Sequence, residues 1–232
     1  MLALGIDTSS EAASVGLARD RRLIAELNLR AGNTHSERLL PGIHALLATA
    51  GVRAEQVDLF AVASGPGSFT GLRIGMATAK GLALAVDRPL VGFSTLEMIA
   101  LTLAAGIPSG ASRSAPICVM LDAGRGEVYR GLFLCEAGRV TSMSAETALT
   151  PEAAATDLPD GCVLCGSGAL AYRDRLQSRL PASTLWVETV PFIGSTLALA
   201  AIGLASEKGS AALPPLVPNY LRLSDAELPR KG

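Results

Sequence analysis

The 232-residue chain has little that would suit it to binding a polyanion or to crossing a membrane. Only 18% of its residues are charged, with 20 Lys and Arg against 21 Asp and Glu. Because phosphate neutralisation needs clustered cations, direct and tight RNA binding is not expected. The start MLALGIDTSS lacks the basic segment of a signal peptide, and the apolar run at 193–205 is shorter than the roughly 20 residues that span a bilayer. We expect a cytoplasmic protein with no membrane segment.

Histidine and cysteine are also scarce, which leaves few metal ligands. There are two histidines, His35 and His44, and at about 100° per residue their spacing puts them on opposite sides of one helix. Cys162 and Cys165 form a C-x-x-C on an expected strand, which points them to opposite faces. We expect no metal site and predict that all four cysteines are small buried residues: Cys118, Cys135, Cys162 and Cys165.

What the chain does have is one pattern of strands and helices that occurs twice. The expected strands are 2–7, 13–19, 23–29, 58–65, 88–94, 117–122, 127–136, 139–144 and 162–166, and the expected helices are 34–50, 69–86, 95–105, 169–180 and 192–207. Three strands, with an Asp at the end of the first, begin each half. The repeat predicts an α/β fold of two related lobes with a duplicated βββαβα topology.

The lobes are separated by a stretch rich in Pro, Gly and Ser. We place the N-terminal lobe at 1–106, a linker at 107–115 and the C-terminal lobe at 116–232. The last helix and the tail are candidates for packing back on the first lobe.

The two Asp-containing turns resemble the phosphate loops of the actin, Hsp70 and sugar-kinase superfamily, the ASKHA fold. They are Asp7-Thr8-Ser9 and Asp122-Ala123-Gly124, and Gly166-Ser167-Gly168 stands where such folds contact adenosine. Two interpretations stay open: the loops retain a nucleotide contact, or the Asp residues cap hairpin turns. The sequence offers no convincing catalytic carboxylate, and a shared fold does not establish a shared activity.

The stretch SGPGSFTGLRIGMATAKGLALA at 64–85 looks like a phosphate loop but lacks its chemistry. Gly71 is followed by Leu72-Arg73 where a Walker A loop has Lys and a hydroxyl residue. The spacing of the glycines and of the following acidic residues does not fit a Rossmann fingerprint either.

The helix behind this loop gives a clearer pattern. Small residues recur every four positions at Gly71, Gly75, Ala79 and Ala83, a ridge that allows another helix to approach closely. A helix that is apolar nearly all round is buried in a core or in an interface, and we predict a partner or dimer interface formed by the ridge and its neighbours Leu72 and Met76. A bulky residue at Gly75 or Ala79 is expected to block assembly and to leave the fold intact.

Several long motifs together resemble the TsaB (YeaZ) family over essentially the whole chain. They are IDTSSEAASVGL, N-T-H-S-E-x-L-L-P at 33–41, SGPGSFTGLRIGMATAKGLA, LDAGRGEVYRGLF and the tail PNYLR. The resemblance implies a non-catalytic scaffold with the ASKHA fold, a paralogue of the transferase TsaD, needed for threonylcarbamoyl transfer to adenosine 37 of tRNA. It implies as well that the stripe Leu39, Leu40, Ile43 and Leu47, on the helix before the ridge, belongs to the same interface as the ridge.

The resemblance also implies partners and cofactors. The chain would form a homodimer, bind TsaD, bind TsaE through the complex and contact tRNA only indirectly. It would need no cofactor of its own, with ATP or ADP possible at the interface of the complex. Thr95 and Ile99 stand where TsaD-like chains have two metal-binding histidines, so the metal would be absent, and Gly124 stands where family members commonly have Arg.

Two other functions remain as alternatives. One is a small ATP-dependent phosphotransferase that uses Asp7 and Asp122 around magnesium-nucleotide. The other is a peptidase, which only the older naming of the family suggests.

Overall fold

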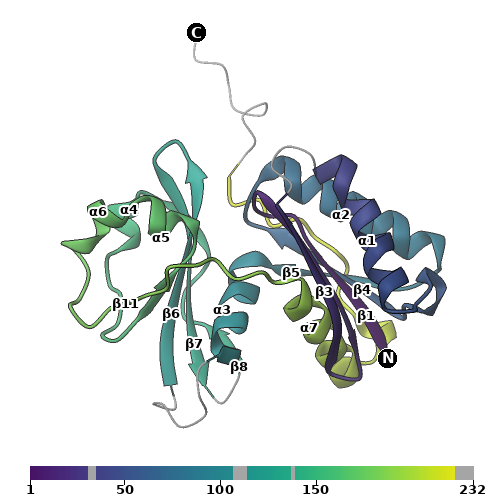
Figure 1. Ribbon diagram of the computed structural model, residues 1–232. Coiled ribbons are helices and arrows are strands. Elements are labelled where there is room, and N and C mark those ends of the chain that lie inside the picture. The colour runs from purple at the N-terminus through teal and green to yellow at the C-terminus, as the bar shows by residue number, and fades with distance from the viewer. Residues whose placement is uncertain (31–34, 107–113, 137–138, 223–232) are drawn as a thin grey trace. The chain divides into compact units, whose positions relative to one another are not determined.

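The computed structural model describes residues 1–30, 35–106, 114–136 and 139–222, and the chain divides into two compact units (Figure 1). The first unit combines Met1–Thr102 with Pro191–Pro218, and the second combines Leu103–Val190 with the chain from Asn219 onward. The last helix thus counts with the first unit. Most of the predicted linker lies outside the described residues, but its last two positions, 114 and 115, belong to a strand.

The first unit is built on a five-stranded sheet with the order β3-β2-β1-β4-β5. Its strands are β1 (Leu2–Asp7), β2 (Ala12–Arg19), β3 (Arg22–Arg30), β4 (Leu59–Gly65) and β5 (Leu90–Ser94). The first three form the predicted antiparallel meander, and β4 and β5 extend it in parallel. Every residue of β1 and β4 is buried, because helices cover both faces of a sheet built this way.

Helices α1 and α2 cover one face of this sheet and α7 covers the other (Figure 1). The helical segments of the unit are α1 (His35–Thr49), η1 (Ala54–Gln56), α2 (Phe69–Ala85), most of α3 (Thr95–Gly106), α7 (Gly194–Lys208) and η2 (Ser210–Ala212). The start of α7 lies directly on the sheet. A β-carbon at Gly5 would overlap the carbonyl oxygen of Gly194, and one at Gly16 would overlap the nitrogen of Ser195. Glycines in β1 and β2 therefore allow this close approach.

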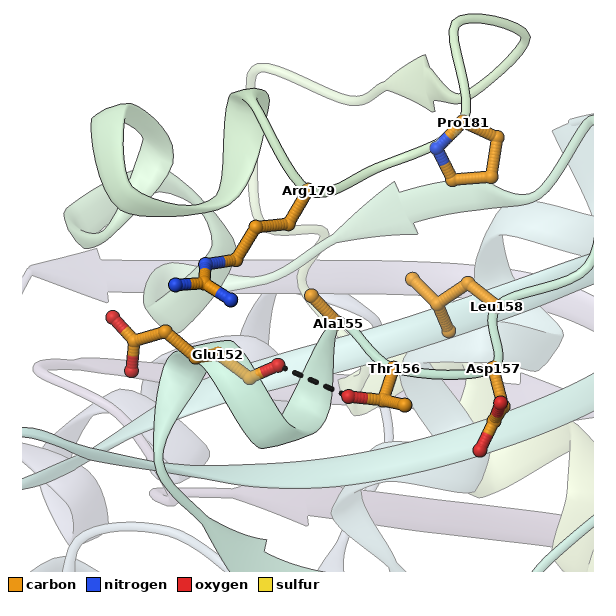
Figure 2. Close-up of a pocket in the computed structure, with 7 residues that line it drawn as sticks. All are labelled: Glu152, Ala155, Thr156, Asp157, Leu158, Arg179 and Pro181. Atoms are coloured by element: carbon orange, nitrogen blue, oxygen red, sulfur yellow. Dashed lines mark hydrogen bonds between the residues drawn. The ribbon is translucent and has the colours of Figure 1, made fainter.

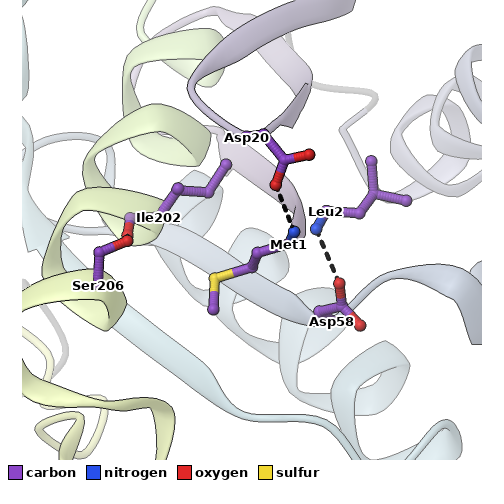
Figure 3. A network of polar contacts seen from close by, with 6 residues as sticks. All are labelled: Met1, Leu2, Asp20, Asp58, Ile202 and Ser206. Carbon is purple, nitrogen blue, oxygen red and sulfur yellow. Dashed lines mark hydrogen bonds and ion pairs between the residues drawn. The ribbon is translucent and has the colours of Figure 1, made fainter.

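Polar contacts fix the start of β1 (Figure 3). The amine of Met1 lies 2.6 Å from Asp20 Oδ1, and the backbone nitrogen of Leu2 donates to Asp58 Oδ2 at 2.8 Å. The hydrogen bond from the amine lowers the pKa of Asp20. These contacts connect the first strand to the β2–β3 turn and to the segment before β4.

The second unit repeats the arrangement of the first. Its elements are β6 (Ser114–Gly124), β7 (Glu127–Glu136), β8 (Arg139–Ser142), β9 (Thr147–Leu149), α4 (Pro151–Ala154), β10 (Val163–Cys165), α5 (Ser167–Ala171), α6 (Arg173–Gln177) and β11 (Leu185–Trp186). The sheet order is β11-β10-β6-β7-β8, with β9 paired to β7. Since β10 runs parallel to β6 as β4 does to β1, the predicted duplication is confirmed.

Local predictions fail in the second unit where elements are short. The single helix predicted at 169–180 is two helices, α5 and α6, which meet at Tyr172, a residue with φ −110° and ψ 21°. Its hydroxyl donates to Asp122 Oδ1 at 3.3 Å. The sequence did not predict α4, β9 or β11, because segments this short show no periodicity. The capping box predicted at Thr34 lies outside the described residues.

Candidate functional site

The first predicted phosphate loop, Asp7-Thr8-Ser9, is filled by the chain itself. Thr8 Oγ1 donates to the carbonyl oxygen of Gly71 at 2.7 Å, and the backbone nitrogen of Ser68 donates to the carbonyl oxygen of Ser9 at 2.7 Å. Thr8 is 1% exposed and Ser9 6%. Thr8 and Ser9 are therefore held by the loop before α2 and by the first turn of that helix.

Asp7 lies at the end of β1 with 6% of its surface exposed. One carboxylate oxygen accepts a hydrogen bond from the Ser9 nitrogen at 2.8 Å. Burial raises the pKa of Asp7, and this effect outweighs the opposing effects of the Ser9 hydrogen bonds and of the charge of His35. This hydrogen bond, from a backbone nitrogen two residues further along the chain, is typical of an Asp that stabilises a turn.

The ridge of small residues on α2 faces this loop rather than a partner. A β-carbon at Gly71 would overlap the carbonyl oxygen of Thr8, and one at Gly75 would overlap Thr8 Oγ1. Ala79 and Ala83 are likewise buried in the first unit. The prediction that the ridge receives another protein's helix is therefore wrong. Four-residue spacing indicates a close approach, and here the neighbour is the strand end of the same unit.

The other predicted interface residues are also internal, with one exception. The buried ones are Leu39, Ile43, Leu47, Leu72 and Met76. Leu40 is 43% exposed. The exposed residues of the two helices include a different set, which we call the outer helix face: Leu40, Pro41, His44 and Ala48 on α1, and Arg73, Ala77, Lys80 and Leu84 on α2. Leu84 is 71% exposed, the largest fraction among the exposed large apolar residues described.

The second predicted loop is a hairpin turn in the second unit. Asp122 Oδ1 accepts from the Gly124 nitrogen at 2.9 Å, and the Asp122 nitrogen donates to Ser167 Oγ at 3.1 Å. Burial and the charge of Asp122 raise the pKa of Tyr172. Gly124 has φ +71°, a conformation that favours glycine.

Gly166 and Gly168 serve packing between β6 and α5. A β-carbon at Gly166 would overlap the carbonyl oxygen of Met120, and one at Gly168 would lie 2.8 Å from the carbonyl carbon of Leu121. These glycines are thus needed for the fold of the second unit, whether or not a nucleotide approaches them.

The residues at the predicted metal positions are buried and are not metal ligands. Thr95 is 1% exposed and Ile99 3%, and Thr95 Oγ1 has no hydrogen-bond partner among the described residues. His35 is buried at the start of α1, with Nε2 2.9 Å from the carbonyl oxygen of Ser10, whereas His44 is exposed. Within the described residues, no three His, Cys, Asp or Glu side chains are grouped so that they could hold a metal ion.

All four cysteines are buried free thiols, as predicted. Burial raises the pKa of Cys118 to about 12 and that of Cys162 to about 11. Neither thiol is therefore a thiolate near neutral pH, which is the form that acts as a nucleophile.

A hollow of about 400 Å³ in the second unit was not predicted (Figure 2). It is lined by Glu152, Ala155, Thr156, Asp157, Leu158, Arg179 and Pro181. The carboxylate of Glu152 is held by Arg175 through two contacts of 2.8 and 3.0 Å, and Thr156 Oγ1 donates to the Glu152 carbonyl oxygen at 3.3 Å. The contacts between Glu152 and Arg175 hold α4 against α6, and the Thr156 hydrogen bond lies at the end of α4. Together they do not form a catalytic arrangement.

Comparison with known proteins places the chain in a family. The profile described as "TsaD: tRNA N6-adenosine threonylcarbamoyltransferase" matches residues 29–226. The tRNA threonylcarbamoyladenosine biosynthesis protein TsaB of Bacillus subtilis is 34% identical over 246 residues, which cover 98% of this chain and 96% of that protein. The chain belongs to the TsaB family. The match to a TsaD profile agrees with the predicted kinship between TsaB and TsaD.

Solved structures support the same assignment. YeaZ from Pseudomonas aeruginosa, 30% identical, aligns with a TM-score of 0.74 over 93% of this TsaB-family chain and 99% of its own. The ROK hexokinase of Thermus thermophilus, 15% identical, aligns with a TM-score of 0.50 over 89% of this chain and all of its own. This second likeness concerns the fold alone, and it confirms the predicted actin-like, two-lobed α/β class.

Proposed function

We propose that this chain is a non-catalytic accessory subunit in tRNA threonylcarbamoyladenosine biosynthesis, which binds TsaD directly and TsaE through the complex. Membership of the TsaB family supports the pathway. The contacts at Asp7-Thr8-Ser9 support the accessory role, because this loop is occupied by residues 67–75 of the same chain. This internal filling of the loop is the observation on which the proposal rests.

The outer helix face is the proposed binding surface for TsaD. Its apolar members include Leu84, Ala77 and Leu40, and Arg73 stacks on the Phe69 ring with its guanidinium 3.8 Å from the ring centre. Exposed apolar residues beside an arginine and an aromatic ring are typical of protein interfaces. The same surface would form the homodimer, so that self-association and TsaD binding would exclude each other.

Two other exposed apolar residues of the first unit, both on β3, are less suited to binding. Leu23 and Ile24 lie on β3, the edge strand of the sheet, at 49% and 40% exposure. Ile24 is the extra residue of a bulge, since Leu17 pairs with Ala25 and Ala18 with Leu23. A bulge in an edge strand hinders the pairing of a further strand.

The proposal includes the cofactor and the location. The chain itself would need no nucleotide or metal, and any ATP or ADP would bind in the assembled complex at its junction with TsaD. Transfer RNA would be contacted through TsaD. No helix among the described residues is long and apolar enough to cross a membrane, and we propose that the protein acts in the cytoplasm.

Reconstitution tests the proposal. The chain is purified together with TsaD and TsaE, and threonylcarbamoyl transfer to tRNA is assayed with each component omitted in turn. We expect transfer to be lost when this chain is omitted and to be absent when this chain is supplied alone. Undiminished turnover without it would refute the accessory role, and transfer by the chain alone would refute the non-catalytic one.

A further inference from the structure

The segment Leu213–Arg222, the tail segment, packs on the protein through every third residue. The partly buried positions include Leu213, Leu216, Asn219 and Arg222. Most residues between them are exposed, Val217 at 66% and Tyr220 at 40%. A polyproline II helix has three residues per turn, so this spacing places the contacts on one face. Leu213 has φ −68° and ψ 138°, which lies in that conformation.

Three prolines favour the polyproline II conformation of the tail segment. Pro214, Pro215 and Pro218 have a fixed φ, and each restricts the residue before it to extended geometry. Little conformational entropy is then lost when the segment binds, as with the proline-rich ligands of recognition domains. The tail segment therefore has the local properties of a peptide ligand.

Its contacts divide between the two units. Leu216 packs in the first unit where Gly92 has no side chain, and a β-carbon at Gly92 would lie 2.5 Å from Leu216 Cδ1. In the second unit, Asn219 Nδ2 donates to Glu146 Oε2 at 2.7 Å. Arg222 Nη1 donates to Glu127 Oε2 at 3.0 Å, with 22% of the arginine side chain and 38% of the glutamate side chain exposed.

Glu127 and Glu146, the glutamate pair, lie on one face of the second sheet. Glu127 is the first residue of β7, and Glu146 directly precedes β9, which pairs antiparallel with β7. Extending that register by one pair at each end puts both side chains on the same side. Two carboxylates in this position accept one amide and one guanidinium, and hydrogen bonds to charged groups are the stronger kind.

We propose that the glutamate pair is a binding site for an extended, proline-led peptide with Asn and Arg three residues apart, which the chain fills with its own tail segment. The contacts of Asn219 and Arg222 are made by side chains at partly exposed positions, which favours exchange of the tail for another peptide of this kind. This inference does not depend on the proposed function in tRNA modification.

Peptide binding to the full chain tests the site. The probe is a fluorescent synthetic peptide, LPPLVPNYLR, with the sequence of the tail segment. Asn219→Ala with Arg222→Ala disables the chain's own tail, and this variant should bind the probe about tenfold or more tightly than the wild type, because an attached tail competes at a millimolar effective concentration. Adding Glu127→Ala and Glu146→Ala should weaken binding about tenfold or more. Fluorescence anisotropy measures each affinity.

A charge exchange distinguishes recognition from general loss of structure. In the tail-disabled background, Glu127→Arg should lose the native peptide and gain a peptide in which glutamate replaces the arginine. Val217→Ala in the peptide is the matched control, since that side chain is exposed, and it should bind as the native peptide does. Failure of the tail-disabled chain to bind at millimolar peptide, equal binding by the glutamate variants, or no gain on charge exchange would each overturn the proposal.

Discussion

Asp7 is a carboxyl group that the fold buries at the end of β1. The phosphotransferase alternative would use Asp7 around magnesium-nucleotide, which requires the charge of the carboxylate. Here its visible role is to accept a hydrogen bond from Ser9, which an uncharged acceptor can also do. The phosphotransferase alternative and the accessory role therefore predict different consequences when the charge of Asp7 is removed.

Asp7→Asn should stabilise the protein near neutral pH. The folded-state pKa of Asp7 lies above its ordinary value of 3.8, so the ionised form costs stability. This cost is absent below that ordinary value and grows as the pH rises through the folded-state pKa. We expect the free energy of unfolding to rise on the order of 1 kcal/mol at pH 7 and to match the wild type near pH 3, as measured by urea denaturation.

The same variant should assemble with TsaD as the wild type does. A phosphotransferase would lose its activity with this substitution. If Asp7→Asn were less stable than the wild type at pH 7, the ionised carboxylate would have a role that the hydrogen bond to Ser9 does not explain.

Gly75→Leu should destabilise the first unit itself, and not only weaken the binding of a partner protein. A side chain at Gly75 would overlap Thr8 Oγ1, which itself donates to Gly71. We expect a loss of about 2 kcal/mol or more in the free energy of unfolding, measured by thermal denaturation. Gly81→Ala on the same helix is the control, since nothing lies within 4 Å of a β-carbon there, and it should gain up to about 1 kcal/mol. A Gly75→Leu protein that melts like the wild type would contradict this packing.

At the scale of the element, helix α2 has two faces that the sequence alone does not distinguish. Its inner face carries Gly71, Gly75 and Ala79, of which the two glycines lie against the chain's own loop. Its outer face carries Arg73 and Leu84, and α1 packs beside α2. Partner binding is therefore expected to depend on the outer residues.

Leu84→Asp should abolish co-purification with TsaD and homodimer formation without changing the melting temperature. The side chain is 71% exposed, so its replacement costs the monomer little, whereas a buried carboxylate in the interface would be strongly unfavourable. Sedimentation velocity and affinity capture measure the outcome. Leu185→Asp, at a 61% exposed leucine in the second unit, is the matched control and should assemble normally. Normal assembly of the Leu84 variant would place the interface elsewhere.

At the scale of the whole molecule, each unit uses its predicted nucleotide loop for its own fold. Thr8 and Ser9 are engaged in the first unit, and Asp122 holds a turn in the second. The similarity to a hexokinase is one of fold, and it does not mean that this chain has a loop free to bind phosphate. The polar groups of both predicted loops are thus used within the units themselves.

Calorimetry with ATP and magnesium should detect no saturable binding by the purified chain up to millimolar nucleotide. The complex with TsaD is the comparison, and binding that appears only there would assign the nucleotide to the assembled complex. Saturable binding in the micromolar range by the chain alone would instead favour the phosphotransferase alternative.

The sequence by itself determined the duplicated topology, the burial of the cysteines and the family, because these depend on local periodicity and on long ordered motifs. It also indicated that Gly71 and Gly75 must be small. Only the tertiary structure decided what lies against them. Periodicity reports that a helix face is covered, but the covering group, Thr8, is more than sixty positions away in the chain. The contacts of the tail segment with Gly92 and Glu127 are decided in the same way, by residues that only the fold brings together.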